Sequence, residues 1–585
     1  MTAPNRNALW ARVIADELVA AGVEAVVIAP GSRSTPLTVA AAREDGLTAY
    51  SHLEERAAAY FALGRAKRSG RPTALVCTSG TAAANFHPAV VEANQARVPL
   101  IALTADRPPE LRGSGANQTI DQEKLYGDAV RFYRDLPEPE ADDRKLRSLR
   151  TTVDRAVATA TGTPPGPVHL NVPFRKPLEP RRVPEDVPED FAAEHPLAAT
   201  GRDGPFVHAS DGHPVLDDAA EAAVARAIEG ADRGLIVAGP DDAFGIDPAT
   251  AADLGAATGF PILADPLSGV RFGPHRNGAT VIGGYDGFLA PAVYADWPDP
   301  DVVLRFGASP TSKALRTYLA DVDARQFVVD PAGGWREATF TASDLLVADP
   351  TRLADRLAST VSRSPDRSHH DAWITGAMTH WEVLEREVDD RLEGAIAERV
   401  VGAAPDPATI VVANSMPVRD LDRFGAPRDA DLTVLGNRGA SGIDGTTSTA
   451  LGAGSVTDDP LVFLTGDLTY LHDATGLLAL GRFDLEATVV LIDNDGGGIF
   501  HMLPIEDYDP PFTSQFKTPH DVDLGGTEAL FDLSFARVEG LADFEDAYRR
   551  SLAADGTQVI AVRTDAEASH RRREEIKRDV IASLT

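Results

Sequence analysis

The fold of this chain is decided by residues 461–500, which read LVFLTGDLTYLHDATGLLALGRFDLEATVVLIDNDGGGIF. One short apolar run ends at Asp467, and a second run, rich in β-branched residues, ends at Asn494. The segment between them has a helix-like pattern, so the stretch predicts a parallel βαβ unit. Because the crossover in such a unit is almost always right-handed, both strands share a sheet and end at the same edge. We therefore expect Asp467 and Asn494 to lie close together.

The residue types at this predicted edge suit a metal ion and a diphosphate. Open α/β sheets bind ligands beyond the carboxyl ends of their strands, and carboxylate and amide oxygens are ligands suited to Mg²⁺. Gly496, Gly497 and Gly498 let the next turn bend sharply and approach a ligand. The plainer alternative is a strand-end aspartate followed by an ordinary glycine-rich turn. The two polar strand ends at this spacing favour a site of the kind that binds thiamine diphosphate.

Strands and helices alternate along the rest of the chain in three blocks. A proline- and acid-rich linker is predicted at 177–196, and a second polar linker at 362–371. This organisation predicts an α/β fold with three doubly wound parallel-sheet domains. The predicted domains span residues 1–185, 200–360 and 370–585.

Composition excludes several classes of protein. The only cysteine, Cys77, excludes a disulfide framework and a multi-cysteine zinc site. The first residues lack the basic start and apolar core of a signal peptide. No apolar run approaches the ~20 residues of a membrane helix. We therefore expect a cytoplasmic protein with no membrane partner.

The net charge of −32 is carried by acidic residues spread over the whole chain. Such a charge makes nucleic acid and anionic membranes poor partners. It indicates a halophilic protein, with an acidic surface adapted to high salt, where screening removes self-repulsion. The alternative is a merely acidic mesophilic protein.

Six segments together resemble one known family, although each is weak alone. Glu55, for example, would read in isolation as a surface acid favoured at a helix start. The segments are APGSRSTPLT (29–38), HLEERAAAYFALG (52–64), TSGTAAANFHPAVVEA (78–93), LTADRPPELRGSGANQTIDQ (103–122), GNRGASGIDG (436–445) and the GDL…NDGGGIF stretch. Over nearly the whole length the chain resembles the 2-succinyl-5-enolpyruvyl-6-hydroxy-3-cyclohexene-1-carboxylate synthase family of thiamine diphosphate-dependent enzymes. The GD…N pair indicates only the superfamily, whereas TADRPPEL, GANQ and NRGASGIDG are more specific to this family.

The resemblance implies a fold of the thiamine diphosphate-dependent decarboxylase and carboligase type, and it implies roles around the cofactor. Glu55 matches the catalytic glutamate that hydrogen-bonds the aminopyrimidine ring and favours its reactive imino tautomer. Asp467, Asn494 and the Gly496 carbonyl match the ligands of Mg²⁺, or Mn²⁺, which holds the diphosphate. Ile443 matches the bulky residue that bends the cofactor. The other residues expected to line the cofactor are Ser441, Gly442, Gly466, Leu468 and Ile499.

Basic residues in predicted turns suggest anionic substrates. In a chain this acidic, five cations in such turns stand out, and they are Arg33, Arg107, Lys313, Arg419 and Arg438. Arginine is the preferred bidentate partner of carboxylates, although any one of the five could be a surface ion pair. The resemblance implies the substrates 2-oxoglutarate and isochorismate.

The family's substrate residues map onto two groups of positions. The residues expected near isochorismate are Ser32, Arg33, Arg107, Asn117, Gln118 and Lys313. Those expected near the succinyl carboxylate are Ser415, Arg419 and Arg438. Phe500 is expected to line the cofactor or substrate pocket. One departure is Ala314, where some family members have a second basic residue, and Arg316 is the nearest replacement.

The resemblance implies a transferase of menaquinone biosynthesis that decarboxylates 2-oxoglutarate and adds its succinyl group to isochorismate in a 1,4 sense. It also implies a homodimer or homotetramer with active sites between subunits. The alternatives are another 2-oxo acid decarboxylase or an acetohydroxyacid synthase-like carboligase, and a binding protein without catalysis. Residues 505–526 are expected to form either a loop that closes over the site or a solvated surface loop.

Overall fold

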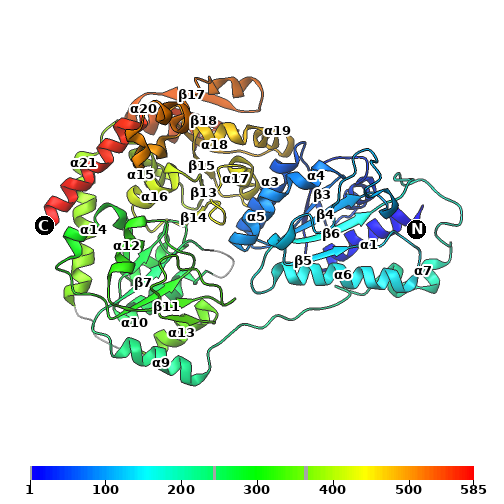
Figure 1. Cartoon of the computed structure of the whole chain (residues 1–585), viewed down its shortest axis with the longest axis horizontal. Helices are drawn as coiled ribbons and strands as arrows, with labels where there is room; N and C mark the ends of the chain where they lie inside the picture. Colours follow the sequence, from blue (N-terminus) through cyan, green and yellow to red (C-terminus); the bar gives the residue numbers. More distant parts are fainter. Residues whose placement is uncertain (1–2, 242–244, 362–366) are drawn as a thin grey trace. The chain divides into compact units, whose positions relative to one another are not determined.

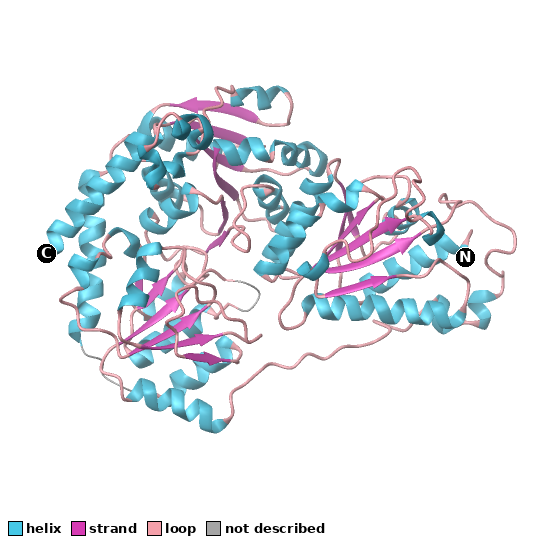
Figure 2. Ribbon diagram, in the orientation of Figure 1, coloured by secondary structure: helices cyan, strands magenta, loops and turns pink. Residues whose placement is uncertain are grey.

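A computed structural model gives the structure of the chain and describes residues 3–241, 245–361 and 367–585. It contains three six-stranded sheets (Figure 1; Figure 2). Neighbouring strands in all three sheets run parallel. The predicted α/β class with three parallel sheets is therefore confirmed.

The first sheet has the strand order β2-β1-β3-β4-β6-β5. Its strands are β1 (Ala25–Ile28), β2 (Thr48–Ser51), β3 (Thr73–Cys77), β4 (Leu100–Asp106), β5 (Phe132–Asp135) and β6 (Val168–Pro173). The helices of this part are α1 (Arg6–Ala20), α2 (Thr35–Ala41), α3 (Glu55–Ser69), α4 (Thr81–Asn85), α5 (His87–Ala96) and α6 (Asp143–Thr161). β3, β4 and β6 are buried along their whole length, as expected for a parallel sheet covered on both faces.

The middle sheet has the order β12-β11-β10-β7-β8-β9. Its strands are β7 (Gly234–Ala238), β8 (Ile262–Ala264), β9 (Val281–Ile282), β10 (Val302–Phe306), β11 (Arg325–Val329) and β12 (Asp344–Leu346). The accompanying helices are α9 (Asp218–Glu229), α10 (Pro248–Thr258), α11 (Pro291–Tyr294), α12 (Lys313–Asp321) and α13 (Pro350–Thr360).

The third sheet repeats the topology of the first, with the order β14-β13-β15-β16-β18-β17. Its strands are β13 (Ala408–Val412), β14 (Leu432–Leu435), β15 (Leu461–Gly466), β16 (Thr488–Asp493), β17 (Ser534–Val538) and β18 (Gln558–Arg563). The helices of this part are α15 (Glu393–Ala403), α16 (Met416–Phe424), α17 (Thr446–Gly454), α18 (Asp467–His472), α19 (Ala479–Phe483), α20 (Gly540–Ser551) and α21 (Ala566–Leu584). In the first sheet the strand order reverses between β1 and β3, and in the third sheet it reverses between β13 and β15. Doubly wound sheets bind ligands at such a reversal.

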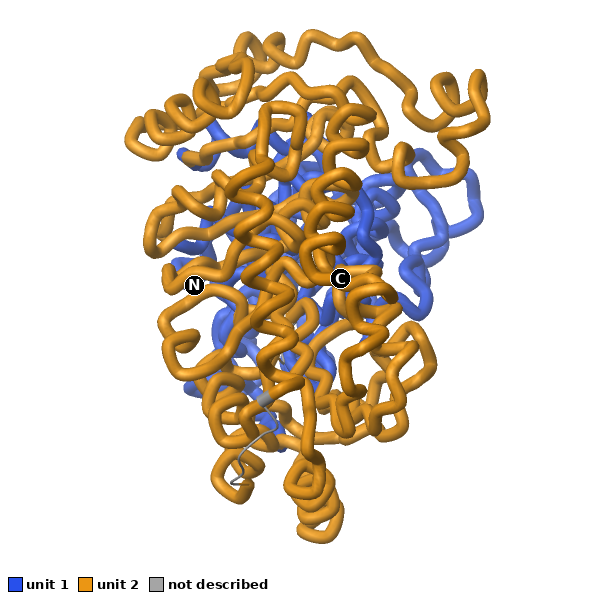
Figure 3. The backbone as a smooth tube through the Cα atoms, turned by 90° about the vertical axis from the view of Figure 1, so that its left-hand side faces the viewer, with its two compact units in different colours: residues 1–212, 437–457, 473–485 blue, residues 213–436, 458–472, 486–585 orange. Residues whose placement is uncertain are grey.

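The chain forms two compact units, which Figure 3 shows in blue and orange. Unit 1 comprises residues 1–212, 437–457 and 473–485, and unit 2 comprises the rest. Residues 437–457, which carry α17, therefore cluster with the N-terminal part of the chain, although they fall inside the predicted 370–585 domain. The predicted domain boundaries stay a prediction.

Within unit 1, α3 and α17 pack against each other at very short range. A Cβ atom on Gly64 would overlap the carbonyl oxygen of Thr449. A Cβ atom on Gly452 would overlap the carbonyl oxygen of Phe61. Each helix therefore needs a glycine where the backbone of the other one crosses it.

The two predicted linkers differ. The first contains two short helices, α7 (Phe191–Glu194) and α8 (Pro196–Ala199). Residues 362–366 of the second lie outside the described residues, and its last residues are helical because α14 (Arg367–Glu387) begins there. Among the described residues, no helix is both long and apolar enough to span a membrane.

Candidate active site

Asp467 lies at the carboxyl end of β15 and opens α18, in unit 2. Its side chain is 2% exposed. Asp467 Oδ2 accepts a hydrogen bond from the backbone N–H of Gly496 (2.9 Å), and Oδ1 accepts one from Leu468 (2.6 Å). Burial raises the pKa of the Asp467 carboxyl, and these two donors oppose that shift. The predicted strand-end aspartate thus contacts the predicted glycine turn directly.

Asn494 follows the next strand, β16, and presents a free oxygen. Its Nδ2 donates to Oε1 of Glu393 at 2.9 Å. Its Oδ1 is buried and has no hydrogen-bond partner among the described residues. Buried polar atoms are normally satisfied, so this orphaned oxygen fits a ligand atom for a hard cation such as Mg²⁺.

Gly496 has a backbone that only glycine adopts easily. Its φ is 136°, and a Cβ atom there would overlap the carbonyl oxygen of Lys517. The Gly496 carbonyl, the third predicted metal ligand, accepts a hydrogen bond from the N–H of Gly498 at 3.0 Å. A carbonyl has two lone pairs, so this bond leaves one free.

His520, which the sequence did not predict as a site residue, lies against the glycine turn that follows β16. Its Nε2 is 3.3 Å from Asp467 Oδ2, and its backbone N–H donates to Asp495 Oδ1 at 3.0 Å. One carboxylate oxygen from each of Asp467 and Asp493 and one ring nitrogen of His520 lie within 4.8 Å of one another. Part of the predicted 505–526 loop therefore packs on the turn that follows β16. No local sequence pattern predicts the position of His520, because only the packing of the loop brings it close to Asp467.

Two of the predicted succinyl-side residues, Ser415 and Arg419, lie at the start of α16. Ser415 has φ 69° and precedes the helix, and its carbonyl accepts a hydrogen bond from Arg419 Nη1 at 2.5 Å. The next residue, Asp420, forms a buried ion pair with Arg573 of α21. Phe500 packs edge-on against Phe516, with ring centroids 5.5 Å apart. Ile499 and Phe500 are half-buried.

The middle-domain lysine is exposed. Lys313 opens α12, and Ser312 caps that helix by accepting from the N–H of Leu315. The half-buried Arg316 donates to the carbonyl of Pro310 at 3.3 Å.

In unit 1, Glu55 opens α3, as predicted, and is half-buried. The preceding residue, Glu54, caps the helix by accepting from Arg56 N (3.0 Å) and Ala57 N (2.9 Å). Burial, together with the nearby Glu55 carboxylate, holds the pKa of the Cys77 thiol well above its usual range. Glu55 thus lies beside the end of β3.

The turns after β1 and β3 are joined to each other around Arg33. The backbone N–H of Arg33 donates to Thr78 Oγ1 (3.2 Å), and Arg33 Nη1 donates to the carbonyl of Phe174 (2.6 Å). Burial and the nearby Arg107 guanidinium lower the pKa of Arg33, and Asp106 opposes that shift. Two of the predicted substrate arginines therefore lie close enough to repel each other.

The segment that carries Asn117 and Gln118 is fixed to the turn after β3. Ser79 Oγ donates to the carbonyl of Gln118 (2.9 Å), and the N–H of Gly80 donates to Gln122 Oε1 (2.9 Å). Gln122 in turn donates to Asn171 Oδ1 at 3.0 Å. The side chains of Asn117 and Gln118 are exposed, and so is that of Ser32.

A buried glutamate, Glu92 of α5, holds the turn after Arg438. Its two carboxylate oxygens accept from the N–H groups of Gly439 (2.8 Å) and Ala440 (2.6 Å). Ser441 follows with φ 60°, and Ile443 is half-buried. Like Glu393 and Gln122, Glu92 lies far along the chain from the turn it holds, so no spacing rule could have found it.

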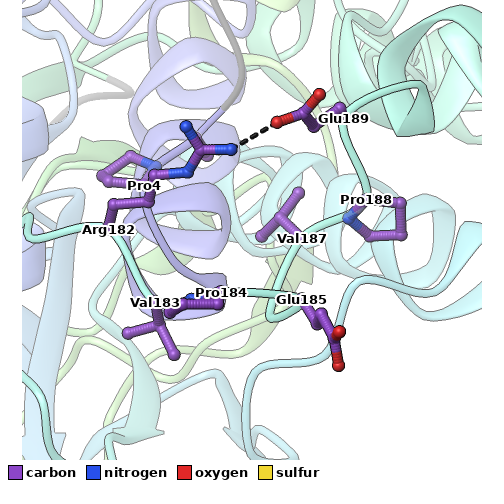
Figure 4. A pocket seen from close by; sticks show the side chains of 9 residues that line it. Pro4, Arg182, Val183, Pro184, Glu185, Val187, Pro188 and Glu189 are labelled. Atoms are coloured by element: carbon purple, nitrogen blue, oxygen red, sulfur yellow. Dashed lines mark hydrogen bonds and ion pairs between the residues drawn. The ribbon is translucent and has the colours of Figure 1, made fainter.

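A surface hollow of about 660 Å³ lies elsewhere in unit 1 (Figure 4). It is lined by Ala3, Pro4, Arg182, Val183, Pro184, Glu185, Val187, Pro188 and Glu189. None of these is a predicted site residue, so the hollow is separate from the candidate site.

Two family models match the chain. The thiamine pyrophosphate enzyme N-terminal TPP binding domain matches residues 10–125, and the C-terminal TPP binding domain matches residues 423–562. These ranges contain Glu55 and Asp467 respectively. The chain therefore has the two domains of an enzyme that uses thiamine diphosphate.

A solved structure, the thiamine diphosphate-dependent 4-hydroxybenzoylformate decarboxylase of Rhodococcus jostii RHA1, has the same fold. Its TM-score is 0.69 at 19% identity, over 95% of this chain and 99% of that one. At this identity the likeness concerns the fold alone.

Three curated relatives carry the same name, 2-succinyl-5-enolpyruvyl-6-hydroxy-3-cyclohexene-1-carboxylate synthase. The protein of Halobacterium salinarum is 62% identical over 98% of both chains, and that of Haloarcula marismortui is 60% identical over 100% of both. The protein of Roseiflexus castenholzii is 44% identical over 97% of this chain and 98% of its own. The first two come from halophilic archaea, in agreement with the acidic composition. This chain belongs to the 2-succinyl-5-enolpyruvyl-6-hydroxy-3-cyclohexene-1-carboxylate synthase family of thiamine pyrophosphate enzymes.

Proposed function

We propose that the chain decarboxylates 2-oxoglutarate and adds the succinyl group to isochorismate in a 1,4 sense, in menaquinone biosynthesis. The observation that carries this proposal is the 62% identity to a synthase of that name over 98% of both chains. The presence of Glu55 at the start of α3, together with the buried, unpartnered oxygen of Asn494, supports an enzyme over a binding protein without catalysis.

The residues of the chain account for holding and activating the cofactor. When bound, thiamine diphosphate supplies a nucleophilic carbon and an electron sink for loss of carbon dioxide. Asp467, Asn494 and the Gly496 carbonyl would hold Mg²⁺ for the diphosphate. Glu55 would hydrogen-bond the aminopyrimidine ring of the bound cofactor, since a carboxylate can act there as hydrogen-bond partner and proton carrier. Ser441, Gly442, Ile443, Gly466, Leu468 and Ile499 line the cofactor.

The substrates are bound through their carboxylates. The nearby Arg107 contributes to the lowered pKa of Arg33, and a dianion bound between the two guanidinium groups would stabilise both charges. With Ser32, Asn117, Gln118 and Lys313 they form the isochorismate side of the site. Ser415, Arg419, Arg438 and Phe500 form the succinyl side. Such clamps orient the two substrates for carbon–carbon bond formation.

The complete site combines two protomers. Glu55 belongs to unit 1 and Asp467 to unit 2, and we infer that Glu55 of one protomer serves the cofactor held by Asp467 of its partner. The assembly is then a homodimer or a homotetramer, and the protein works in the cytoplasm.

A spectrophotometric assay tests the function. Enzyme, thiamine diphosphate, Mg²⁺, 2-oxoglutarate and isochorismate are mixed in molar KCl, and the isochorismate absorbance is followed. We expect loss of that absorbance with release of carbon dioxide. Release of carbon dioxide without loss of isochorismate would indicate a different 2-oxo acid enzyme. Turnover of pyruvate in place of 2-oxoglutarate would indicate the same. No turnover with bound cofactor would overturn the proposal.

Glu55→Gln is the decisive variant, with an expected loss of about 100- to 10,000-fold in kcat, the usual range for a proton-transfer residue. Its matched control is Glu54→Gln, which changes the neighbouring helix cap and should keep most of the activity. Equal activity of Glu55→Gln and wild type would refute the catalytic role of Glu55.

A further inference from the structure

We propose that Glu393 is a positioning residue for the metal site, because it fixes the side-chain amide of Asn494 so that its oxygen faces the cation. The inference rests on the proposed role of Asn494 as a metal ligand. Glu393 opens α15, which is far from Asn494 along the chain but beside it in unit 2.

Both side-chain hydrogen bonds of Glu393 are accepted by one carboxylate oxygen. Its Oε1 accepts from Asn494 Nδ2 at 2.9 Å and from Thr564 Oγ1 at 2.8 Å. Its backbone N–H donates to Ser569 Oγ at 3.0 Å. Glu393 is 2% exposed, so these bonds are shielded from water and electrostatically strong. The end of β16 is thereby tied to α15 and to the β18–α21 junction.

The chemistry of the pair decides which way the asparagine amide points. The oxygen and nitrogen of an asparagine side chain have nearly the same shape, so its orientation is set by its hydrogen-bond partners. Glu393 Oε1 accepts hydrogen bonds from both Thr564 and Asn494, so it faces the NH₂ end of Asn494. The oxygen end must then point away from Glu393, and it is the atom that lacks a partner among the described residues.

Packing leaves room for the amide beside the turn. A Cβ atom on Gly498 would lie 2.8 Å from Asn494 Nδ2, so the last glycine of the DNDGGG turn leaves room for the NH₂ group. Glu393 therefore holds the NH₂ end of Asn494, and Gly498 leaves space for it. Hydrogen-bond partners that orient a metal ligand commonly change metal affinity by about 10- to 100-fold when they are removed.

The test is a binding measurement on the full-length protein. Mn²⁺ is titrated in the presence of thiamine diphosphate, and free Mn²⁺ is followed by electron paramagnetic resonance. For Glu393→Gln we expect a dissociation constant about tenfold higher, because glutamine can present either an oxygen or an NH₂ group to Asn494. Thr564→Val removes the other donor to the same oxygen, and it should change the constant less than twofold. No substrate is used, so failure of the proposed reaction would leave this result intact.

An exchange of the two groups separates positioning from general destabilisation. Asn494→Asp alone places two carboxylates face to face and should weaken Mn²⁺ binding. Combined with Glu393→Gln, it restores a donor–acceptor pair with an oxygen still facing the cation. We expect the double variant to bind Mn²⁺ more tightly than either single variant. The midpoint of thermal unfolding in chelator shows whether each variant is folded, and Glu393→Asp replaces Glu393→Gln if the latter is not.

Two results would overturn the proposal. One is wild-type Mn²⁺ affinity in folded Glu393→Gln. The other is a double variant that binds no better than its parents, since a merely structural glutamate would give additive losses.

Discussion

Two buried glutamates, Glu92 in unit 1 and Glu393 in unit 2, each hold a glycine-containing turn in a different way. Glu92 binds two backbone N–H groups, those of Gly439 and Ala440. Glu393 binds a side chain, the amide of Asn494. A carboxylate on backbone donors fixes the path of the chain whatever side chains it carries. A carboxylate on a side-chain amide fixes which atom is presented to a ligand.

The comparison predicts different consequences for stability and for binding. Substitutions at the Glu92 turn should mainly lower the free energy of unfolding. Substitutions at the Glu393 turn should mainly lower the affinity for the cation.

The largest effect is expected for Asn494→Ala. It removes the ligand oxygen itself, so Mn²⁺ affinity should fall by more than about 100-fold, beyond the range of an orienting partner. Stability in chelator should also fall, by about 1–3 kcal/mol, because the variant removes the Nδ2 donor to the buried Glu393 carboxylate. Mn²⁺ titration and urea unfolding give the two quantities. Near-normal affinity would remove Asn494 from the ligand set.

Gly439→Ala should be the next largest change, and it should act on stability. A Cβ atom there would lie 2.6 Å from the carbonyl oxygen of Glu92 and 2.7 Å from the N of Ala96. Both neighbours are backbone atoms that cannot rotate away, so we expect a loss of about 2–3 kcal/mol from overpacking. Gly402→Ala, inside α15 with no atom nearby, is the control and should be neutral or slightly stabilising.

Glu92→Gln tests the hydrogen bonds of that turn without adding bulk. Glutamine keeps one acceptor oxygen and turns an NH₂ group toward the second N–H, which is left unpaired. The expected cost is about 1–2 kcal/mol in urea unfolding, with Mn²⁺ affinity unchanged. A tenfold loss of Mn²⁺ affinity in this variant would contradict the claim that the Glu92 turn affects stability and not cation binding.

The smallest effect concerns two buried imidazoles, one in each unit. Burial lowers the pKa of His169 to about 3 and that of His380 to about 4. The unfolded chain therefore binds the proton first, at about pH 6.5, so stability is full above that pH and falls as the pH drops toward 4. When the pH falls from about 7 to about 5.5, each imidazole should lower the free energy of unfolding by about 1 kcal/mol.

The measurement is urea unfolding at both pH values. The variants His169→Gln and His380→Gln should each lose less stability than wild type over this interval. His208→Gln, at an exposed position, should follow wild type. Parallel pH profiles for all four proteins would contradict the assignment of buried neutral imidazoles.

The sequence was sufficient for the class of fold and for the strand ends. Regular alternation of apolar runs and helices predicted three parallel sheets, because period and length are local properties. The same logic placed Asp467 and Asn494 at neighbouring strand ends, where β15 and β16 do pair. Between them the single predicted helix is broken into α18, a 3₁₀ turn at Ala474–Leu478 and α19.

What could not be predicted depends on contacts between distant parts of the chain. Glu92, Glu393 and His520 carry no local signature, since a glutamate in a helix or a histidine in a loop is usually solvated. Their roles come from burial against turns that the sequence places elsewhere. The clustering of residues 437–457 with unit 1 likewise follows from the packing of α17 on α3.

The close crossing of α3 and α17 also restricts how this sequence can vary. Gly64 and Gly452 each make room for the backbone of the other helix. The residue tolerated at one position therefore depends on the residue at the other. A larger residue at either one forces the helices apart and removes the reason for glycine at the other. Substitutions there should therefore survive selection only in pairs, and a library randomised at both codons should return the wild-type pair far more often than any single change.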